Sequence, residues 1–304
     1  MKHLFIVNPT AGGKDKTEFV RAAAEEALKG SSDKFEIYVT KARMDAPEKI
    51  REEAAKNDRL HVYACGGDGT FNECVCGAAM LDNVAVAPFP TGTGNDFCRM
   101  FGEESGLYRD LKALVRGSEH PIDLIDCNGR YSVNICCVGI DARVGADVHK
   151  YSKIPLIGGA TGYVVSVLVH IFKGIARRMK VKCGDYVKDA ELSLVCACNG
   201  RFYGGGFNPS LNARPDDGII DIYIIKKIGL ITLAKLIGKY AKGRADELPE
   251  YVTHLRSDTL SIEFDEDNVV NLDGEVIYAK DISMKLVPGA LKLIVPEGMK
   301  FFES

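Results

Sequence analysis

Short apolar runs alternate with longer amphipathic stretches over the first hundred residues of the chain. The apolar runs predict strands at residues 4–7, 35–40, 60–64 and 84–89. The amphipathic stretches predict helices at about residues 17–28, 46–56 and 71–80, with a further helix after residue 97. Continuous apolar strands that alternate with helices are typical of a parallel sheet covered by helices on both faces. The first part of the chain is therefore predicted to be an α/β domain.

The pattern changes near Pro121, after which short β-prone segments follow one another closely. They lie at residues 122–126, 131–138, 179–182, 191–198, 219–225, 259–264, 269–272 and 282–287. Turn signals separate them at Asn128-Gly129, Gly184-Asp185, Asp217-Gly218 and 265–268. Two helical segments interrupt the series, at about 161–177 and 230–242. This density of short strands predicts an antiparallel sandwich or barrel-like domain.

The stretch Gly66-Gly67-Asp68-Gly69-Thr70 lies between the apolar run 60–64 and the predicted helix 71–80. Glycines at a strand-to-helix junction allow a sharp turn and a close approach of the backbone to a ligand. The N–H groups there lie at the positive end of the following helix, which favours phosphate. Because Asp68 would repel a phosphate, a metal ion is expected between them. The stretch thus indicates a nucleotide-phosphate site with Mg²⁺.

Local structure offers a second interpretation of the same residues. Thr70 and Glu73 have the spacing of a capping box, which any helix can use. Likewise, residues 92–96 could be a turn followed by an Asn or Asp helix cap. The turn interpretation predicts no ligand at either stretch.

Polar or glycine residues follow each of the first four predicted strands. They are Asn8, Thr40, Gly66 with its neighbours, and Thr93. Ligands of open α/β sheets bind beyond the carboxyl ends of the strands, so these residues are expected to converge. The loop from Asn8 to Lys14 resembles a P-loop only superficially, because it lacks the first glycine and the Ser or Thr after the lysine.

Asp273-Gly274-Glu275 follows the predicted strand 269–272. Asp-Gly is a favoured hairpin pair, so one interpretation is a turn with a polar tip. The other interpretation is a pair of carboxylates at the edge of a site, able to accept a proton or to help hold a metal. The sequence leaves both open.

Composition narrows the class of protein. The 304 residues suffice for two domains, and 46% hydrophobic with 27% charged residues is typical of globular proteins. A formal charge of -3 argues against nucleic-acid binding through overall positive charge. Ten cysteines without a signal-peptide pattern indicate reduced, mostly buried thiols.

Two segments have membrane-like features. Residues 154–172 carry no Asp, Glu, Lys or Arg, but Pro155, three glycines and His170 make a membrane span a poor interpretation. A loop followed by a buried helix is expected there. The predicted helix 230–242 has a basic face, which we expect to be solvated. The alternative is weak docking on an anionic membrane surface.

Taken in order, the motifs resemble those of lipid kinases of the diacylglycerol kinase catalytic-domain family, over most of the chain. The matching stretches are Asn8-Pro9 with Gly12, 66–70 with Asn72-Glu73, 92–97, 122–124, Asn199-Gly200 with 204–206, Asp217-Gly218 and 273–275. The stretch 92–97, Gly-Thr-Gly-Asn-Asp-Phe, distinguishes this branch from the NAD kinases, which share only the first glycine motif.

The resemblance implies a Rossmann-like α/β domain followed by an antiparallel β-sandwich, with the chain end returning to the first domain. The expected boundaries are 1–122, joined by 289–304, for the nucleotide domain and 123–288 for the lipid-substrate domain. The residues implied to line the ATP site are Asn8, Gly12, Thr40, Gly66, Gly67, Asp68, Gly69, Thr70, Phe71, Asn72 and Thr93.

The resemblance also implies catalytic and metal residues. Glu275 or Asp273 would be the base that takes the proton from the lipid hydroxyl, and Asp123 would support a metal or carboxylate network near a cleft between the domains. Asp217 and the carbonyl of Ile219 would match a structural metal site. Arg214 stands where some relatives have another acid, which weakens that second metal site.

The implied activity is ATP- and Mg²⁺-dependent phosphorylation of a lipid hydroxyl, most simply that of diacylglycerol to give phosphatidic acid. The alternatives are a kinase for a sphingoid base or another lipid alcohol, an NAD kinase, and a non-catalytic nucleotide- or lipid-binding regulator. We expect a cytoplasmic protein without a membrane span, acting peripherally on a membrane. An exposed sheet edge would allow a homodimer.

Overall fold

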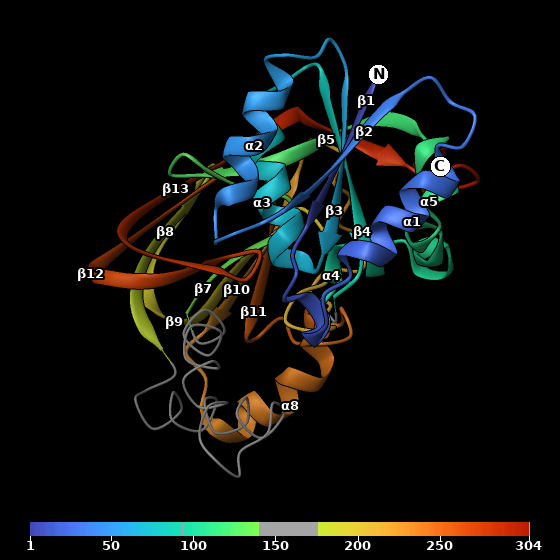
Figure 1. Cartoon of the computed structure of the whole chain (residues 1–304). Coiled ribbons are helices and arrows are strands. Elements are labelled where there is room, and N and C mark those ends of the chain that lie inside the picture. The colour runs from blue at the N-terminus through green and yellow to red at the C-terminus, as the bar shows by residue number, and fades with distance from the viewer. Residues whose placement is uncertain (93, 140–175, 304) are drawn as a thin grey trace. The chain divides into compact units, whose positions relative to one another are not determined.

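The computed structural model describes residues 1–92, 94–139 and 176–303 (Figure 1). The chain forms two compact units, one of residues 1–124 with 287–304 and the other of residues 125–286. The uncharged stretch 154–172 lies outside the described residues. So does the predicted helix 161–177, except for its last two residues, of which Arg177 begins strand β8 (Arg177–Cys183).

The first unit is built on a parallel sheet. Its strands follow the order β2-β1-β3-β4, and the end of β13 runs parallel to β4 through Lys292 and Leu293. The bounds are β1 (Lys2–Val7), β2 (Lys34–Val39), β3 (Leu60–Gly66), β4 (Val84–Pro90) and β13 (Glu275–Val295). Every residue of β3 is buried, which agrees with a strand covered on both faces. The predicted α/β class is confirmed.

Helices cover both faces of this sheet, with α2 and α3 on one side and α1 and α5 on the other (Figure 1). The helices are α1 (Thr17–Ala27), α2 (Asp45–Ala54), α3 (Asp68–Ala78), α4 (Asp96–Arg99) and α5 (Leu111–Val115), with 3₁₀ turns at Ala11–Gly13, Gly102–Arg109 and Phe301–Glu303. Helix α3 begins three residues before the predicted start, with Gly67 as its N-cap. The predicted capping box of Thr70 and Glu73 is therefore wrong, because Thr70 lies inside the first turn.

The end of the chain packs within the first unit, as expected. The ring of Phe301 meets that of Phe101 edge-on at 4.9 Å between centroids, and Phe302 stacks on His120 at 4.2 Å. The backbone N–H groups of Lys300 and Phe301 donate to the carboxylate of Glu104. Aromatic packing and these hydrogen bonds fix the last turn.

An ion-pair network within the first unit joins β1 to helix α2. Lys2 and Lys49 each contact both Glu36 and Glu53, with Lys49 Nζ at 2.7 Å from Glu36 and 2.8 Å from Glu53. Glu53 is only 5% exposed. Burial raises the pKa of Glu53, but the hydrogen bonds and charges of Lys2 and Lys49 outweigh it and bring the pKa down to about 2. The network thus requires the ionised carboxylate.

Glu53→Gln should lower the free energy of unfolding by about 2 kcal/mol at pH 7, because it leaves two lysines with one acidic partner. A lowered carboxyl pKa stabilises the fold above the ordinary value of 4.5, and this contribution is lost as the pH falls from 4.5 toward 2. Urea midpoints of variant and wild type should therefore converge below pH 4.5. Glu52→Gln, on the exposed side of the same helix, is the matched control and should change little. A difference between the two urea midpoints that does not change with pH would contradict the account.

The second unit is antiparallel. Its strands follow the order β11-β10-β9-β7-β12-β13, while β8 pairs with β9 and β12, and β5 forms a hairpin with β6. The bounds are β5 (Ser118–Cys127), β6 (Arg130–Ser132), β7 (Ile135–Gly139), β9 (Tyr186–Cys198), β10 (Ile220–Lys226), β11 (Val252–Ser257) and β12 (Thr259–Leu272), with helix α8 (Leu230–Tyr240) and a 3₁₀ turn at Ala245–Glu247. The predicted β-sandwich class is confirmed.

Two strand predictions in this unit are wrong in detail, and one strand was missed. The turn expected at 265–268 is a register shift inside β12, which runs unbroken because β13 supplies a partner on both sides of it. The strand expected at 131–138 is two strands, β6 and β7, interrupted at Val133 and Asn134. Strand β11 was not predicted.

The second unit has two buried clusters. One fills the sandwich and includes Cys136, Val195 and Leu260. The other lies between the sheet and α8 and includes Cys137, Cys196 and Leu236. Cys196 and Cys198 share one face, with their sulfurs 3.6 Å apart, as their spacing on a strand predicts. Cys74 and Cys76 have the same spacing but lie on helix α3, where residues two positions apart do not share a face. All ten cysteines are free thiols, and nine of them are buried.

Candidate functional site

Three loops meet at the carboxyl ends of β1, β3 and β4. A Cβ on Gly67 would lie 2.9 Å from the carbonyl oxygen of Gly94, one on Gly92 would lie 2.9 Å from the nitrogen of Gly67, and one on Gly12 would lie 3.0 Å from the carbonyl oxygen of Thr91. The N–H groups of Thr91 and Gly92 both donate to the carbonyl of Gly66. Glycine is therefore required for the backbones to approach this closely.

The residues that directly follow β1 and β2 complete this edge of the sheet. Asn8 donates from Nδ2 to Thr70 Oγ1 at 3.2 Å, and its Oδ1 accepts from the N–H and the hydroxyl of Thr10. Thr40 lies at the end of β2, where its N–H donates to the carbonyl of Val7 at 2.9 Å. Asn8, Thr40 and the glycine loop thus gather at one sheet edge, the arrangement that their positions after strands predict.

Asp68 joins the first glycine motif to the second. Its Oδ1 accepts hydrogen bonds from the backbone N–H groups of Asp96 at 2.7 Å and Phe97 at 3.3 Å, which are the first residues of helix α4. The side chain of Asn95, at the N-cap position, makes no cap hydrogen bond and donates to the carbonyl of Gly92 instead. The local-cap interpretation of residues 92–96 is therefore wrong, because the cap comes from Asp68. Asp96 is a buried carboxylate next to the half-buried Asp68, and the sequence predicted only a helix cap for it.

The remaining residues expected at the nucleotide site differ in accessibility. Gly69 is exposed, and a Cβ built on it would meet nothing within 4 Å. Phe71 is 3% exposed and packs against Phe97 at 4.8 Å between ring centroids. Asn72 is also buried, and its Oδ1 accepts from Cys76 Sγ. Thr93 lies outside the described residues. Gly69 thus offers open backbone, whereas Phe71 belongs to the core beneath it.

Asp123 lies on β5 within the first unit and is 5% exposed. Its Oδ1 accepts from the backbone N–H of Gly289 at 2.9 Å. Gly289 has φ +61°, so this bond holds a left-handed turn within β13. The geometry gives Asp123 a structural role at the entry of β13 into the first unit.

Asp273 and Gly274 form the two-residue turn between β12 and β13, with φ values of +51° and +91°. The carboxylate of Asp273 turns back toward the break between β6 and β7. Oδ1 accepts from Ser132 Oγ at 2.7 Å and from the N–H groups of Asn134 and Ile135, and Oδ2 accepts from the N–H of Val133 at 2.7 Å. These four donors explain why the predicted strand 131–138 is interrupted.

Two asparagines, Asn134 and Asn199, hold the backbone that donates to Asp273. The sequence did not identify either of them as part of a site. Asn199 Nδ2 donates to the carbonyl of Val133 at 2.8 Å, and the carbonyl of Asn134 accepts from the N–H groups of Asn199 and Gly200. A Cβ on Gly200 would lie 2.0 Å from Asn134 Oδ1. The Asn199-Gly200 motif therefore fixes the backbone that holds Asp273. Glu275, half-buried, is the first residue of β13, two positions later.

Asp217 lies in the loop before β10 and is paired with a cation of the chain itself. Its Oδ2 accepts from Arg256 Nη2 at 3.0 Å and its Oδ1 from the N–H of Ile219 at 3.1 Å. Arg214 pairs with Asp216 at 3.0 Å. The guanidinium of Arg256 supplies the positive charge that a metal would bring to Asp217, so this arrangement does not favour the second metal site.

The part of the chain that the structure describes holds no cluster of three or more His, Cys, Asp or Glu side chains arranged for a metal. Mg²⁺ in phosphoryl-transfer sites needs only one or two protein carboxylates, since waters and substrate phosphates supply its other ligands. Asp68, on the first turn of α3 beside exposed Gly69, has the donor chemistry for this role. The glycine loop can thus hold phosphate, with one carboxylate for a hydrated Mg²⁺.

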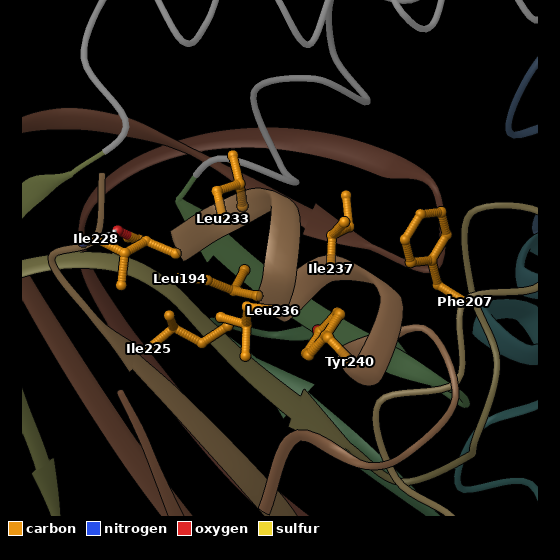
Figure 2. A pocket seen from close by; sticks show the side chains of 9 residues that line it. Leu194, Phe207, Ile225, Ile228, Leu233, Leu236, Ile237 and Tyr240 are labelled. Atoms are coloured by element: carbon orange, nitrogen blue, oxygen red, sulfur yellow. Dashed lines mark hydrogen bonds between the residues drawn. The ribbon is translucent and has the colours of Figure 1, made fainter. Parts of the chain in front are cut away.

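An apolar pocket lies beneath helix α8 in the second unit. Leu236 and Tyr240 point from the helix toward Leu194 of β9 and Ile225 of β10, and Ile237 and Phe207 lie at one side (Figure 2). Its volume is about 360 Å³, including its opening to solvent.

Comparison with known proteins finds two successive domains in the chain. Residues 2–127 match the diacylglycerol kinase catalytic domain, and residues 134–295 match the YegS C-terminal NAD kinase beta sandwich-like domain. Helices among the described residues are all too short or too polar to cross a membrane.

Relatives match over nearly the whole chain. A probable lipid kinase YegS-like from Pseudomonas aeruginosa is 29% identical over 98% of this chain and 95% of its own, and one from Shewanella frigidimarina is 27% identical over 93% and 92%. The crystal structure of a putative diacylglycerol kinase from Bacillus anthracis superimposes with a TM-score of 0.78, at 28% identity over 98% of both chains. The chain therefore belongs to the diacylglycerol kinase family of lipid kinases.

Proposed function

We propose that this protein transfers the γ-phosphoryl group of ATP to the hydroxyl of diacylglycerol in a Mg²⁺-dependent reaction, giving phosphatidic acid and ADP. The observation that carries the proposal is the junction of the two glycine motifs through Asp68, at the N-terminus of helix α3. Family membership supports a kinase with ATP as phosphate donor and a lipid as acceptor.

The first unit binds the phosphates in this proposal. Phosphoryl transfer depends mainly on positioning and on neutralising charge, with little covalent chemistry for the protein to perform. The exposed backbone at Gly69 and the positive end of α3 provide N–H donors without a side chain in the way. When bound, Mg²⁺ would neutralise charge on the phosphates, and Asp68 would hold it directly or through water.

The second unit supplies the base. The four hydrogen bonds to Asp273 occupy its carboxylate, so we assign Asp273 to holding the turn and Glu275 to proton transfer. The lipid oxygen attacks the γ-phosphorus and the bond from that phosphorus to the β–γ bridging oxygen breaks. The hydroxyl proton goes to the Glu275 carboxylate and ADP leaves. A positioned base of this kind contributes about a hundredfold or more.

The acceptor is tested by offering several alcohols side by side. Diacylglycerol in mixed micelles, a sphingoid base, another lipid alcohol and NAD are each incubated with labelled ATP and Mg²⁺. Labelled phosphatidic acid alone supports the proposal. Label on the sphingoid base or on NAD keeps the phosphate site and overturns the acceptor, and ATP binding without any transfer supports the regulator instead.

Gly69→Ala separates ligand binding from folding. Alanine in a helix is favoured over glycine by about 0.5–1 kcal/mol, and a Cβ at Gly69 meets nothing within 4 Å, so the melting temperature should not fall. If ATP occupies that open space, the KM for ATP should rise roughly tenfold, because about 1.4 kcal/mol of contact is lost.

Gly67→Ala is the matched comparison. Its Cβ would lie 2.9 Å from the carbonyl oxygen of Gly94, so it should lower the melting temperature. An unchanged KM for ATP in the stable Gly69→Ala protein would place the phosphates elsewhere.

A further inference from the structure

Helix α4 has only four residues, and the N–H groups of its first two residues hold the carboxylate of Asp68. A helix this short does not persist by itself, because the nucleation of a helix costs more than one turn of hydrogen bonds returns. Phe97 and Cys98 of α4 are both buried. The place of α4 in the first unit, and with it the orientation of Asp68, therefore depends on the side chains that pack against it.

A row of aromatic rings packs against α4. Phe97 lies against Phe71 of α3 at 4.8 Å between ring centroids and meets Phe101 edge-on at 5.7 Å. Phe101 comes just after the helix, is 4% exposed and also contacts Tyr108 at 5.2 Å. Aromatic pairs at such distances stabilise a fold beyond the apolar area that they bury. Phe101 thus links α4 to the 3₁₀ turn at Gly102–Arg109.

The last 3₁₀ turn of the chain packs against the same ring. Phe301 meets Phe101 at 4.9 Å between centroids, and Phe302 lies 5.9 Å from it. The turn that carries these two rings has supports of its own, because Glu104 accepts from the N–H of Phe301 and Phe302 stacks on His120. The turn is therefore anchored independently of α4 and can act as a fixed support for Phe101.

We propose that Phe301 and Phe302 are positioning residues for the Asp68 carboxylate. They hold Phe101, Phe101 holds α4, and the two N–H groups at the start of α4 fix Asp68 Oδ1. Without the rings, α4 would shift and the carboxylate would lose the orientation in which it serves the phosphate site. The inference rests on the proposed role of Asp68 in phosphate transfer, but the hold on α4 is measured without any substrate.

The test begins with hydrogen–deuterium exchange of the full-length protein, without ATP or lipid. In Phe301→Ala the amides of residues 96–101 should exchange up to about tenfold faster, which is the equilibrium factor that one aromatic pair contributes. Phe35→Ala is the matched control, since Phe35 is another half-buried phenylalanine of the first unit, on β2 and edge-on to Phe5 at 6.3 Å. Both variants should lower the melting temperature, but the control should leave exchange at residues 96–101 unchanged.

Turnover of diacylglycerol is then measured at a temperature at which both variants are folded. Phe301→Ala should lower kcat roughly tenfold to a hundredfold, because displacing a catalytic group by about 1 Å can cost a hundredfold. The KM for diacylglycerol should stay the same, because the change acts on the Asp68 carboxylate and not on lipid binding. Phe301→Leu, which keeps an apolar side chain against Phe101, should recover most of the rate. Phe35→Ala should turn over like wild type, since a general loss of stability does not slow molecules that remain folded.

Three results would each overturn the inference. They are unchanged exchange at residues 96–101 in Phe301→Ala, equally faster exchange there in Phe35→Ala, and a normal kcat in a protein in which those residues exchange faster. Phe302→Leu, which removes the more distant ring and keeps an apolar side chain, takes the place of Phe301→Ala if that variant does not fold. A wild type that transfers no phosphate to diacylglycerol would overturn the proposed acceptor, and the exchange comparison would still decide whether the two rings position α4.

Discussion

Asp68→Asn should abolish measurable phosphate transfer, with a fall of roughly a thousandfold in kcat, while the protein remains folded. Asparagine keeps an oxygen that can accept from the N–H groups of Asp96 and Phe97, so the cap of α4 survives. What it loses is the negative charge that would hold Mg²⁺ near the phosphates. Losing one preorganised electrostatic contact commonly costs two to three orders of magnitude in rate. The measurement is kcat with saturating ATP and Mg²⁺, alongside a urea denaturation curve.

Asp68→Ala is the comparison that separates the two roles of this carboxylate. Alanine removes the acceptor as well as the charge, and should also lower the free energy of unfolding by about 1–2 kcal/mol. If Asp68→Asn retained wild-type turnover, the carboxylate would act only as a cap, and the assignment of the phosphate site to this loop would be wrong.

Glu275→Gln should lower kcat by about a hundredfold to ten-thousandfold, because a general base is lost. Asp273→Asn should behave differently. The amide nitrogen of the new asparagine would face either the N–H of Val133 or the groups that now donate to Oδ1 of Asp273. In both cases one hydrogen-bond donor would lie opposite another. The expected loss is about 1–3 kcal/mol in the free energy of unfolding.

The two variants are compared by denaturation and by kcat against pH. Glu266→Gln, an exposed glutamate on the neighbouring strand β12, is the control for charge removal and should match wild type in both. A Glu275→Gln protein with normal turnover, or an Asp273→Asn protein with normal stability and no turnover, would reverse the roles assigned to the two carboxylates.

The strands of the first unit are predictable because each is a mostly apolar run that is followed by a loop containing polar residues or glycines. Residues 60–64 and 84–89 needed no tertiary information to be placed. The capping box of Thr70 and Glu73 is an equally local signal, yet it is wrong. Helix α3 begins at Asp68, whose side chain is engaged by α4. Local patterns therefore predicted the elements better than their ends.

The features that the sequence did not predict depend on contacts between residues that lie far apart along the chain. Asp68 and Asp96 are 28 positions apart, and Asp273 breaks the strand at Val133 from 140 positions away. Strand β12 continues through 265–268 because β13 pairs with it on both sides. Arg256, which pairs with Asp217 from 39 positions away, carries no sequence signal for that role. Spacing along the chain contains none of this information.

The most direct test of the proposed reaction is the rate of phosphatidic acid formation from diacylglycerol and γ-labelled ATP by the wild-type protein, with Mg²⁺ and with the metal chelated. The account predicts label in phosphatidic acid, in stoichiometric balance with ADP, and none after chelation. No labelled phosphatidic acid in the presence of Mg²⁺, or formation that is unaffected by chelation, would contradict it.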